Sequence, residues 1–367
     1  MKVECIIEKL SKNILQVERI AGRNHSLQVI NCILLEATKN SLIIRSTNLD
    51  LGVEITMPVK VVTEGSVAIP AGILGSFLSS ISDDKTVTLS VEENNLFVST
   101  QKNKTHIKTH LKEDFPTIPV VVSDKTFKIN AGEFVRGLKS VWYSSAISSM
   151  KAELSSVYIY CNDDEDIVFV ATDSFRLAEK KIQTKKAKEF GSLLIPFKNI
   201  PEIIRVLEEI SGEVQVNLEK NQISFSYDGV YLTSRVIDGI FPDYKQIIPK
   251  GNTTEVVMLK QDFVNSLKIA NIFSNKLNQI NVKALPSKKV FELQTKNSDV
   301  GDNTNTIDAV FSGEDVDINF NYKYIVDCLQ SIESDSVSLS FNGISKPLVI
   351  RGVSDKSFLY LVMPMNK

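Results

Sequence analysis

The 367-residue sequence has few of the side chains on which catalysis usually depends. It contains only three histidines, His25, His106 and His110, and one tryptophan. The sequence has no HExxH, GxxxxGK[ST], GxGxxG or GxSxG motif. His106 and His110 lie in an alternating, strand-like segment, where residues four apart are about 13 Å from each other, too far to share a metal ion. We therefore expect no catalytic centre, no metal site and no cofactor.

Cysteines and long apolar runs are also scarce. Cys5, Cys32, Cys161 and Cys328 are far apart and form no CxxC pair, so we predict reduced and mostly buried thiols. Charged residues interrupt the apolar pattern of the N-terminus, and no segment approaches the ~18 uncharged apolar residues of a membrane span. These features predict a cytoplasmic protein without membrane contact.

Glycine, proline and net charge are low as well. The 16 glycines and 11 prolines leave no stretch with the composition of a flexible linker, and 43% hydrophobic content predicts compact folding. The 42 basic residues are balanced by 44 acidic ones, for a net charge of -2. This balance excludes a polybasic nucleic-acid binder, so any DNA contact must come from a local patch.

The sequence repeats a helical pattern three times. Apolar residues at i, i+4 and i+7 predict an amphipathic helix in each third. The three sets are Leu10, Ile14 and Val17; Phe134, Leu138 and Val141; and Phe263, Leu267 and Ala270. Their offsets are 124 residues from Leu10 to Phe134 and 129 from Phe134 to Phe263. Such self-similarity at about one third of the length indicates tandem repeats.

Further signals recur at nearly the same spacing. A strand end followed by a helix appears at 68–81, 194–207 and 319–332, where Asn321 can cap the third helix. A β-hairpin pattern follows each of these helices. In addition, 47–50 (TNLD) matches 172–175 (TDSF) at an offset of 125 residues. We predict an α+β fold of three tandem domains, 1–124, 125–252 and 253–367, each with two helices and antiparallel sheets.

Basic residues are expected on the first helix of every repeat. Lys9, Lys12, Arg19 and Arg23 oppose Glu18 in the first repeat, and the corresponding helices of the other two repeats also carry more basic than acidic residues. Ordinary solvated helix faces are one interpretation of this asymmetry. A basic, helix-lined surface that faces phosphates is the other.

An acidic run at 163–166 (DDED) allows two interpretations. Four carboxylates in sequence could bind Mg²⁺ or Ca²⁺ and would then point to a metal-dependent enzyme such as a nuclease. The run also lies between two alternating apolar segments, 157–160 and 167–170, which favours the turn of a β-hairpin.

Three segments resemble the bacterial sliding clamp family, the β subunit of DNA polymerase III. They are ATDSFRLA at 171–178, SRVIDGIFPDY at 234–244 and YLVMPM at 360–365. Their order and spacing, together with the threefold repeat, extend the resemblance over the whole chain. The resemblance implies a non-enzymatic processivity clamp that docks the replicative polymerase, the clamp loader and repair polymerases. It also implies a head-to-tail homodimeric ring that encircles double-stranded DNA without sequence preference.

The resemblance also assigns residues to each contact. It places basic residues toward the DNA: Lys12, Arg23, Lys151, Lys198 and Arg205. It places a hydrophobic cleft for short linear peptides between the second and third domains. The residues that match this cleft are Leu154, Thr172, Ser174, Phe175, Arg176, Leu177, Pro242, Ile247, Asn321, Tyr324, Leu361, Val362, Met363, Pro364 and Met365. Arg176 is expected to hold the peptide's carbonyl groups or a glutamine.

The same resemblance implies a subunit contact at Ile272 and Phe273, which would pack near Ile107 of a second copy. Core burial is the competing interpretation of these three residues, and a buried last strand is the competing interpretation of 362–365 (VMPM). A β-rich scaffold that binds peptides without DNA remains the alternative function. It predicts the same cleft but no role for the basic residues.

Overall fold

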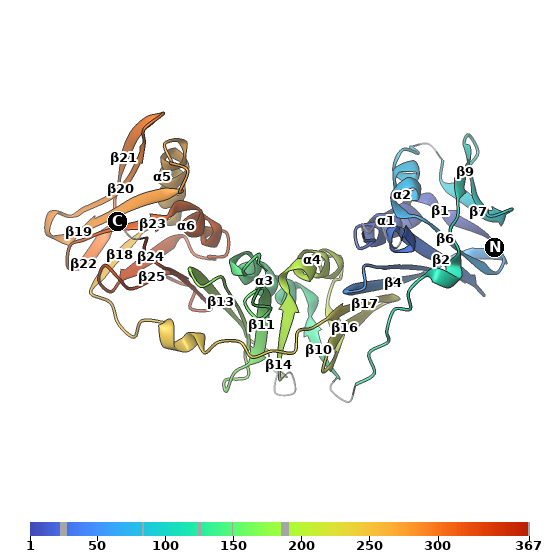
Figure 1. Ribbon diagram of the computed structural model, residues 1–367, viewed down its shortest axis with the longest axis horizontal. Helices are drawn as coiled ribbons and strands as arrows, with labels where there is room; N and C mark the ends of the chain where they lie inside the picture. Colours follow the sequence, from blue (N-terminus) through green and yellow to red (C-terminus); the bar gives the residue numbers. More distant parts are fainter. Residues whose placement is uncertain (23–27, 83, 124–125, 149, 185–190, 366–367) are drawn as a thin grey trace. The chain divides into compact units, whose positions relative to one another are not determined.

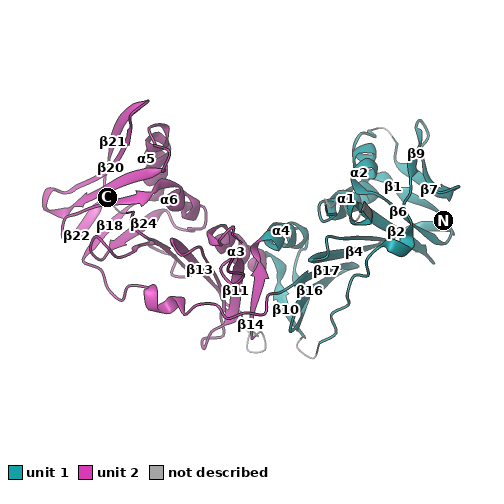
Figure 2. Ribbon diagram, viewed as in Figure 1, with its two compact units in different colours: residues 1–132, 198–236 teal, residues 133–197, 237–367 magenta. Residues whose placement is uncertain are grey.

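The structure is a computed structural model that describes residues 1–22, 28–82, 84–123, 126–148, 150–184 and 191–365 (Figure 1). The chain forms two compact units, which we call unit 1 and unit 2 (Figure 2). Unit 1 contains Met1–Gly132 and Lys198–Val236, and unit 2 contains Glu133–Phe197 and Ile237–Lys367. The division passes through the middle third of the sequence. The predicted boundaries near residues 124 and 252 stay a prediction.

Each third of the chain builds nearly the same series of elements, which begins with a strand and a helix and ends with a second helix and three strands. The first series is β1 (Lys2–Ile6), α1 (Ile7–Glu18), β2 (Cys32–Thr38), β3 (Ser41–Thr47), β4 (Leu51–Pro58), β5 (Lys60–Thr63), β6 (Gly65–Pro70), α2 (Ala71–Ser79), β7 (Thr86–Glu92), β8 (Asn95–Ser99) and β9 (Lys104–Lys108). The second is β10 (Thr126–Asn130), α3 (Ala131–Val141), β11 (Ser156–Cys161), β12 (Ile167–Thr172), β13 (Arg176–Ile182), β14 (Ser192–Pro196), α4 (Ile200–Glu208), β15 (Glu213–Glu219), β16 (Gln222–Tyr227) and β17 (Val230–Arg235). The third is β18 (Thr254–Leu259), α5 (Lys260–Ile272), β19 (Gln279–Leu285), β20 (Val290–Asn297), β21 (Gly301–Ile307), β22 (Val310–Gly313), β23 (Val316–Asn321), α6 (Tyr322–Leu329), β24 (Ser336–Phe341), β25 (Leu348–Gly352) and β26 (Phe358–Val362).

The predicted apolar stripes face the core. Leu10, Ile14 and Val17 of α1 are fully buried, as are Phe134, Leu138 and Val141 of α3. The stripe of α5 is buried as well, and Asn321 caps α6 by accepting a hydrogen bond from the Lys323 N–H at 3.0 Å. The helical repeat and the cap are therefore confirmed.

Four antiparallel sheets carry these helices. Unit 1 contains a five-stranded sheet in the order β5-β1-β7-β8-β9 and an eight-stranded sheet in the order β10-β15-β16-β17-β4-β3-β2-β6. Unit 2 contains a nine-stranded sheet in the order β14-β11-β12-β13-β26-β25-β24-β18-β22 and a four-stranded sheet in the order β21-β20-β19-β23. In the described residues, no helix is long and apolar enough to cross a membrane.

The repeats join by the same kind of strand pair. In unit 1, β4 of the first series pairs with β17, the last strand of the second. In unit 2, β13 of the second series pairs with β26, the last strand of the third, in the register Leu177↔Leu361 and Glu179↔Leu359. The third series has β21 at the place of β4 and β13, and the first series ends with β9, at the place of β17 and β26. Neither β21 nor β9 has such a partner, and both lie at sheet edges.

The predicted thiols are confirmed. Cys5, Cys32 and Cys328 are buried and Cys161 is half-buried, and none of them forms a disulfide. Burial raises the pKa of the Cys5 thiol to about 12 and that of the Cys32 thiol to about 11, which suppresses the reactive thiolate.

A buried aromatic cluster fastens the segment 241–248 to the nine-stranded sheet of unit 2. Phe241 stacks on Tyr158 with the ring centroids 4.8 Å apart. The Tyr244 hydroxyl donates a hydrogen bond to the Glu179 carboxylate and lies 2.8 Å from the Tyr160 hydroxyl. Burial and the neighbouring Glu179 carboxylate raise the pKa of Tyr244 well above its usual value. Tyr244 therefore remains a neutral hydrogen-bond donor. Glu179 needs such a donor, because its carboxylate is buried, with the residue only 7% exposed.

We expect Tyr244→Phe to lower the free energy of unfolding by about 1–3 kcal/mol, because Glu179 loses a buried donor. Urea denaturation measures this loss. Tyr160→Phe is the matched control, since it removes a hydroxyl from the same cluster and leaves the Tyr244–Glu179 hydrogen bond in place. It should cost about 1 kcal/mol or less. Equal losses in the two variants would contradict the assignment of Tyr244 as the anchor.

Candidate functional site

Two turns with the same sequence echo have the same geometry. The Thr47 hydroxyl donates to the Leu51 carbonyl at 2.7 Å, and the Thr172 hydroxyl donates to the Arg176 carbonyl at 2.6 Å. The residue two places after each threonine, Leu49 or Ser174, has a positive φ of 74° or 77°. The repeat is thus confirmed at atomic detail. In unit 2 this turn places Phe175 directly before the first residue of β13, and Phe175 is 62% exposed.

Apolar side chains remain exposed around this turn. Met363 follows β26 directly and is 38% exposed, while its N–H donates to the Phe175 carbonyl at 2.8 Å. Ile247, on the segment held by Tyr244, is 51% exposed, and Pro242 on the same segment is exposed as well. Isolated exposed apolar residues are common, but Phe175 and Met363 lie on hydrogen-bonded neighbouring segments. They are suited to contact an apolar group of a partner.

Other residues expected in the cleft lie beneath this surface. Leu177 and Leu361 are 1% and 2% exposed and belong to the cluster under Tyr244. Val362 is fully buried on the opposite face of β26 from Leu361, because neighbouring strand residues alternate in direction. Burial of the last strand therefore holds for Leu361 and Val362 and ends at Met363. Val362 supports the sheet and presents no surface to a peptide.

Arg176 is occupied by partners within unit 2. Its Nε donates to Asp173 at 2.9 Å, its Nη1 to Asp327 at 2.5 Å and its Nη2 to the Tyr143 carbonyl at 2.6 Å. The guanidinium carbon lies 4.5 Å from the centre of the Tyr324 ring. Burial works against the charged form, but the neighbouring Tyr360 and the Asp327 hydrogen bond outweigh it and raise the pKa of Arg176. Arg176 therefore ties β13 to α6 and holds Tyr324.

The remaining predicted cleft residues also lie in unit 2. Leu154 is half-buried, and its carbonyl accepts the Ala146 N–H at 2.9 Å. Pro364 and Met365 are half-buried, and the Met365 N–H donates to the Asn319 carbonyl, two residues before Asn321. The C-terminal segment is thus hydrogen-bonded to the edge of the four-stranded sheet.

Several residues that shape this region were missed by sequence reasoning. Tyr244 and Asp173 lie inside the motifs that carry the resemblance, so their position was a usable signal. Asp327 and Tyr143 carry no motif, and only the fold brings them to Arg176.

The basic residues expected to face DNA are largely paired with acids. In unit 1, Lys12 Nζ lies 2.7 Å from Glu209 and Lys198 Nζ lies 2.5 Å from Asp50. Both pairs are exposed to solvent and contribute little to stability.

Arg205 of α4 contacts both its own helix and α1. It pairs with Glu202 at 2.6 Å and donates to the Gln16 carbonyl at 2.5 Å. The structure therefore places Arg205 beside α1, the helix that carries Lys12. Lys151 lies exposed in a turn of unit 2, and Arg23 falls outside the described residues.

The first helix of unit 1 corrects one charge prediction. Because α1 ends at Glu18, it contains Glu8 and Glu18 beside Lys9 and Lys12 and is electrically neutral. The helices α3 and α5 keep an excess of one positive charge each. The repeated positive excess therefore holds for two of the three helices.

The residues expected at a subunit contact differ in exposure. Ile272 at the end of α5 is 65% exposed, and Phe273 is half-buried beside Gly301, the first residue of β21. Ile107 is only 4% exposed, which favours its core-burial interpretation, and its contact with a second copy stays a prediction. The face of β9 opposite to Ile107 carries His106, whose ring lies 6.1 Å from that of the exposed Phe97.

The acidic run forms a turn. Asn162 N–H donates to the Asp166 carbonyl at 3.0 Å between β11 and β12, which confirms the hairpin. No group of three potential metal-ligating side chains occurs within the described part of the chain.

Comparison with known proteins gives one family throughout. The family models of the DNA polymerase III beta subunit match the N-terminal domain at residues 1–119, the central domain at 128–243 and the C-terminal domain at 245–366. The beta sliding clamp of Synechococcus elongatus is 25% identical, over 100% of this chain and 99% of its own. That of Haemophilus influenzae is 25% identical, over 98% of each chain.

Solved structures agree with this match. The DNA polymerase III beta subunit of Thermotoga maritima has a TM-score of 0.92 at 25% identity and covers 100% of this chain and 99% of its own. The sliding clamp of Bartonella birtlesii, bound to griselimycin, has a TM-score of 0.94 at 25% identity with full coverage of both chains. With three clamp domains in one α+β chain, this protein belongs to the DNA polymerase III beta subunit family, the bacterial beta sliding clamps.

Proposed function

We propose that this sliding clamp works as a head-to-tail homodimeric ring around double-stranded DNA and docks partner proteins through an apolar cleft. The family is a non-catalytic processivity factor of DNA polymerase III. The proposal includes the three domains 1–124, 125–252 and 253–367, a cytoplasmic location, and docking of the polymerase, the clamp loader and repair polymerases.

The observation that carries the ring is that two of the edge strands, β9 and β21, stand at the places of the repeat where the other strands pair. Within the chain, β4 pairs with β17 and β13 pairs with β26, at equivalent places of the repeat. The same rule applied once more requires β21 to pair with β9, which are both edge strands here. Open edges are otherwise a route to aggregation, so pairing with a second copy would satisfy both. Phe273 lies beside Gly301 at the start of β21, and the preceding Ile272 offers exposed apolar area to that contact.

We expect the protein to sediment as a dimer at micromolar concentration in analytical ultracentrifugation. Ile272→Glu should shift it to monomer, because a carboxylate buried in the interface is costly. Ile344→Glu is the matched control, since Ile344 is also largely exposed but lies on the loop between β24 and β25. If the unsubstituted protein sedimented as a monomer, the proposed dimeric ring would be wrong.

A ring that encloses DNA can function even though its DNA-facing cations are paired with carboxylates. A protein that holds DNA by attraction needs many free phosphate contacts, whereas a closed ring needs only weak, sequence-blind ones. Lys12, Lys198 and Arg205 each contact an acid of unit 1, so each must exchange a carboxylate for a phosphate to bind DNA. Weak contacts of this kind permit sliding.

The double variant Asp50→Asn/Glu209→Gln should bind DNA more tightly at low salt, because it frees Lys198 and Lys12. Its salt dependence should steepen by about one unit of slope per freed phosphate contact. Fluorescence anisotropy of a labelled duplex at several salt concentrations measures both effects. The control Glu93→Gln/Asp228→Asn makes the same charge change at exposed turns of unit 1. An equal gain in the control would show that only net charge matters.

The cleft proposal rests on the exposed residues around β13 and β26. Phe175, Met363 and Ile247 offer apolar area to the leucine or phenylalanine anchors of a peptide, and the Tyr244 anchor holds the segment that bears Ile247. Griselimycin in the Bartonella birtlesii clamp shows that a relative binds a ligand. For Arg176, the internal partners favour a positioning role beside Tyr324 over direct contact with the peptide.

Deletion of residues 363–367 should abolish binding of a labelled peptide that carries glutamine, leucine and phenylalanine anchors. Because β26 ends at Val362, the sheet and the dimer should persist. Met363→Ala should weaken binding about tenfold or more, the loss typical of a buried anchor, whereas Val310→Ala, at an exposed apolar residue on β22, should not. Fluorescence polarisation measures the affinity. An unchanged affinity after the deletion would place the peptide elsewhere.

A further inference from the structure

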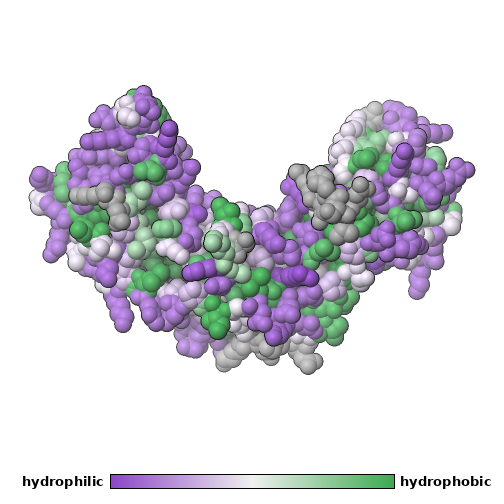
Figure 3. All heavy atoms as spheres, in the orientation of Figure 1, coloured by the Kyte–Doolittle hydropathy of each residue, from purple (hydrophilic) through white to green (hydrophobic). Residues whose placement is uncertain are grey.

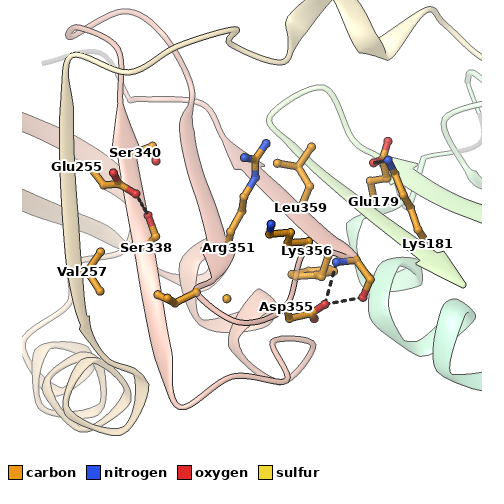
Figure 4. A pocket seen from close by; sticks show the side chains of 14 residues that line it. Glu179, Lys181, Glu255, Val257, Ser338, Ser340, Arg351, Asp355, Lys356 and Leu359 are labelled. Carbon is orange, nitrogen blue, oxygen red and sulfur yellow. Dashed lines mark hydrogen bonds and ion pairs between the residues drawn. The ribbon is translucent and has the colours of Figure 1, made fainter.

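A polar hollow lies on the nine-stranded sheet of unit 2, apart from the residues discussed above as the cleft. Its volume is about 450 Å³, within the range of ligand sites, and its lining comes from β13, β18, β24, β25, β26 and the loop 353–357 (Figure 4). In Figure 4, Arg351 projects from β25 between Glu255 on one side and Lys181 on the other. Figure 3, drawn in the orientation of Figure 1, shows a face on which hydrophilic residues dominate and hydrophobic ones form small groups.

The carboxylates of the hollow already have partners. Glu255 accepts the Ser338 hydroxyl at 2.6 Å, and Glu179 accepts the Tyr244 hydroxyl. Asp355 accepts the Ser357 N–H at 2.8 Å and pairs with the buried Lys180 at 3.3 Å. Burial opposes the charged form of Asp355, but the Ser357 and Lys180 contacts outweigh it and lower its pKa. Each of these three carboxylates is therefore held by at least one donor of the protein itself.

The cations that line the hollow make fewer hydrogen bonds and ion pairs than its carboxylates. Lys181 lies 3.9 Å from Glu179, at the limit of an ion pair. Arg351 and Lys356 are exposed and make no hydrogen bond or ion pair to the residues that the structure describes. Arg351 stands opposite Ser338 in the β24–β25 pair. The unused binding capacity of the hollow is therefore that of hydrogen-bond donors with positive charge.

We propose that this hollow is a docking site for an acidic peptide segment of a partner protein, whose carboxylates bind Arg351 and Lys356. An arginine fork matches a carboxylate in bidentate geometry. Val257 and Leu359 add an apolar floor for a neighbouring side chain of the peptide. A nucleic-acid backbone fits less well, because Arg351 and Lys356 are separate cations among the carboxylates of Glu179, Glu255 and Asp355. A peptide can place single carboxylates at the two cations and uncharged residues elsewhere, whereas a nucleic acid brings a continuous row of phosphates.

The place of the hollow in the sheet supports a protein partner. On β13 and β26 the pair Leu177↔Leu361 lies under Tyr244, and the next pair on the same face, Glu179↔Leu359, lines the hollow. Two residues of a strand span about 7 Å, so the hollow begins one pleat beyond the floor of the proposed cleft. Its own chemistry does not require that the cleft proposal be correct.

The test uses the full-length protein and a fluorescein-labelled nonapeptide of alternating glutamate and valine. We expect measurable binding by fluorescence polarisation, and at least about tenfold weaker binding of the glutamine–valine peptide. Arg351→Glu should weaken binding of the glutamate peptide by at least about tenfold and Lys356→Gln by less. The control Lys346→Glu, at an exposed lysine before β25 and outside the hollow, should change it less than about twofold.

Equal affinity for the two peptides, or an unaffected Arg351→Glu variant, would overturn the proposal. So would a nine-nucleotide oligothymidylate that binds more tightly than the glutamate peptide and loses its affinity in Arg351→Glu, because the hollow would then serve nucleic acid. Thermal unfolding of each variant shows whether the fold is intact. The readout is independent of the cleft, because the deletion of residues 363–367 should leave binding of the glutamate peptide unchanged.

Discussion

The pairing of one repeat's sheet edge with the next is the constraint on which the rest of the structure depends. A strand with unpaired N–H and C=O groups is stable only when another strand covers it or when it is otherwise protected. The pairs β4–β17 and β13–β26 meet this need inside the chain, and β9 and β21 remain at the edges. The second of these pairs also places Leu177 beside Leu361, although they are more than 180 residues apart in sequence. The proposed cleft is thus a product of the same joint that holds the repeats together.

Strand β13 connects the two polar anchors of this joint. On one face, Glu179 accepts a hydrogen bond from Tyr244 and so holds the segment with Pro242 and Ile247. On the other face, Arg176 ties the strand to Asp327 of α6. Because alternate residues of a strand point to opposite faces, one short strand can hold both a loop and a helix. Buried polar groups of this kind cost free energy unless they are fully paired, and their partners thereby determine a single arrangement.

Charge is distributed in a way that suits a non-catalytic clamp. The expected DNA contacts Lys12, Lys198 and Arg205 are balanced by nearby carboxylates, and α1 is neutral. The near balance of 42 basic and 44 acidic residues over the whole sequence is therefore also found locally, at these three cations. Attraction between such a surface and phosphate is weak and easily exchanged, which agrees with the ring that we propose, in which enclosure rather than attraction would keep the protein on DNA.

The sequence by itself determined the features that depend on local periodicity: the helical stripes of α1, α3 and α5, the Asn321 cap, the hairpin at 163–166, and the matching turns at Thr47 and Thr172. These depend on residues within about seven positions of each other, and the pattern contains them completely. Only the tertiary structure decided that Ile107 faces the core, that Arg176 is occupied by Asp327, and that Lys12 meets Glu209. The physical reason is that each outcome is set by contacts between segments that are distant in the sequence. Strand register decides which face Ile107 takes, and the packing of helices decides which carboxylate each cation meets.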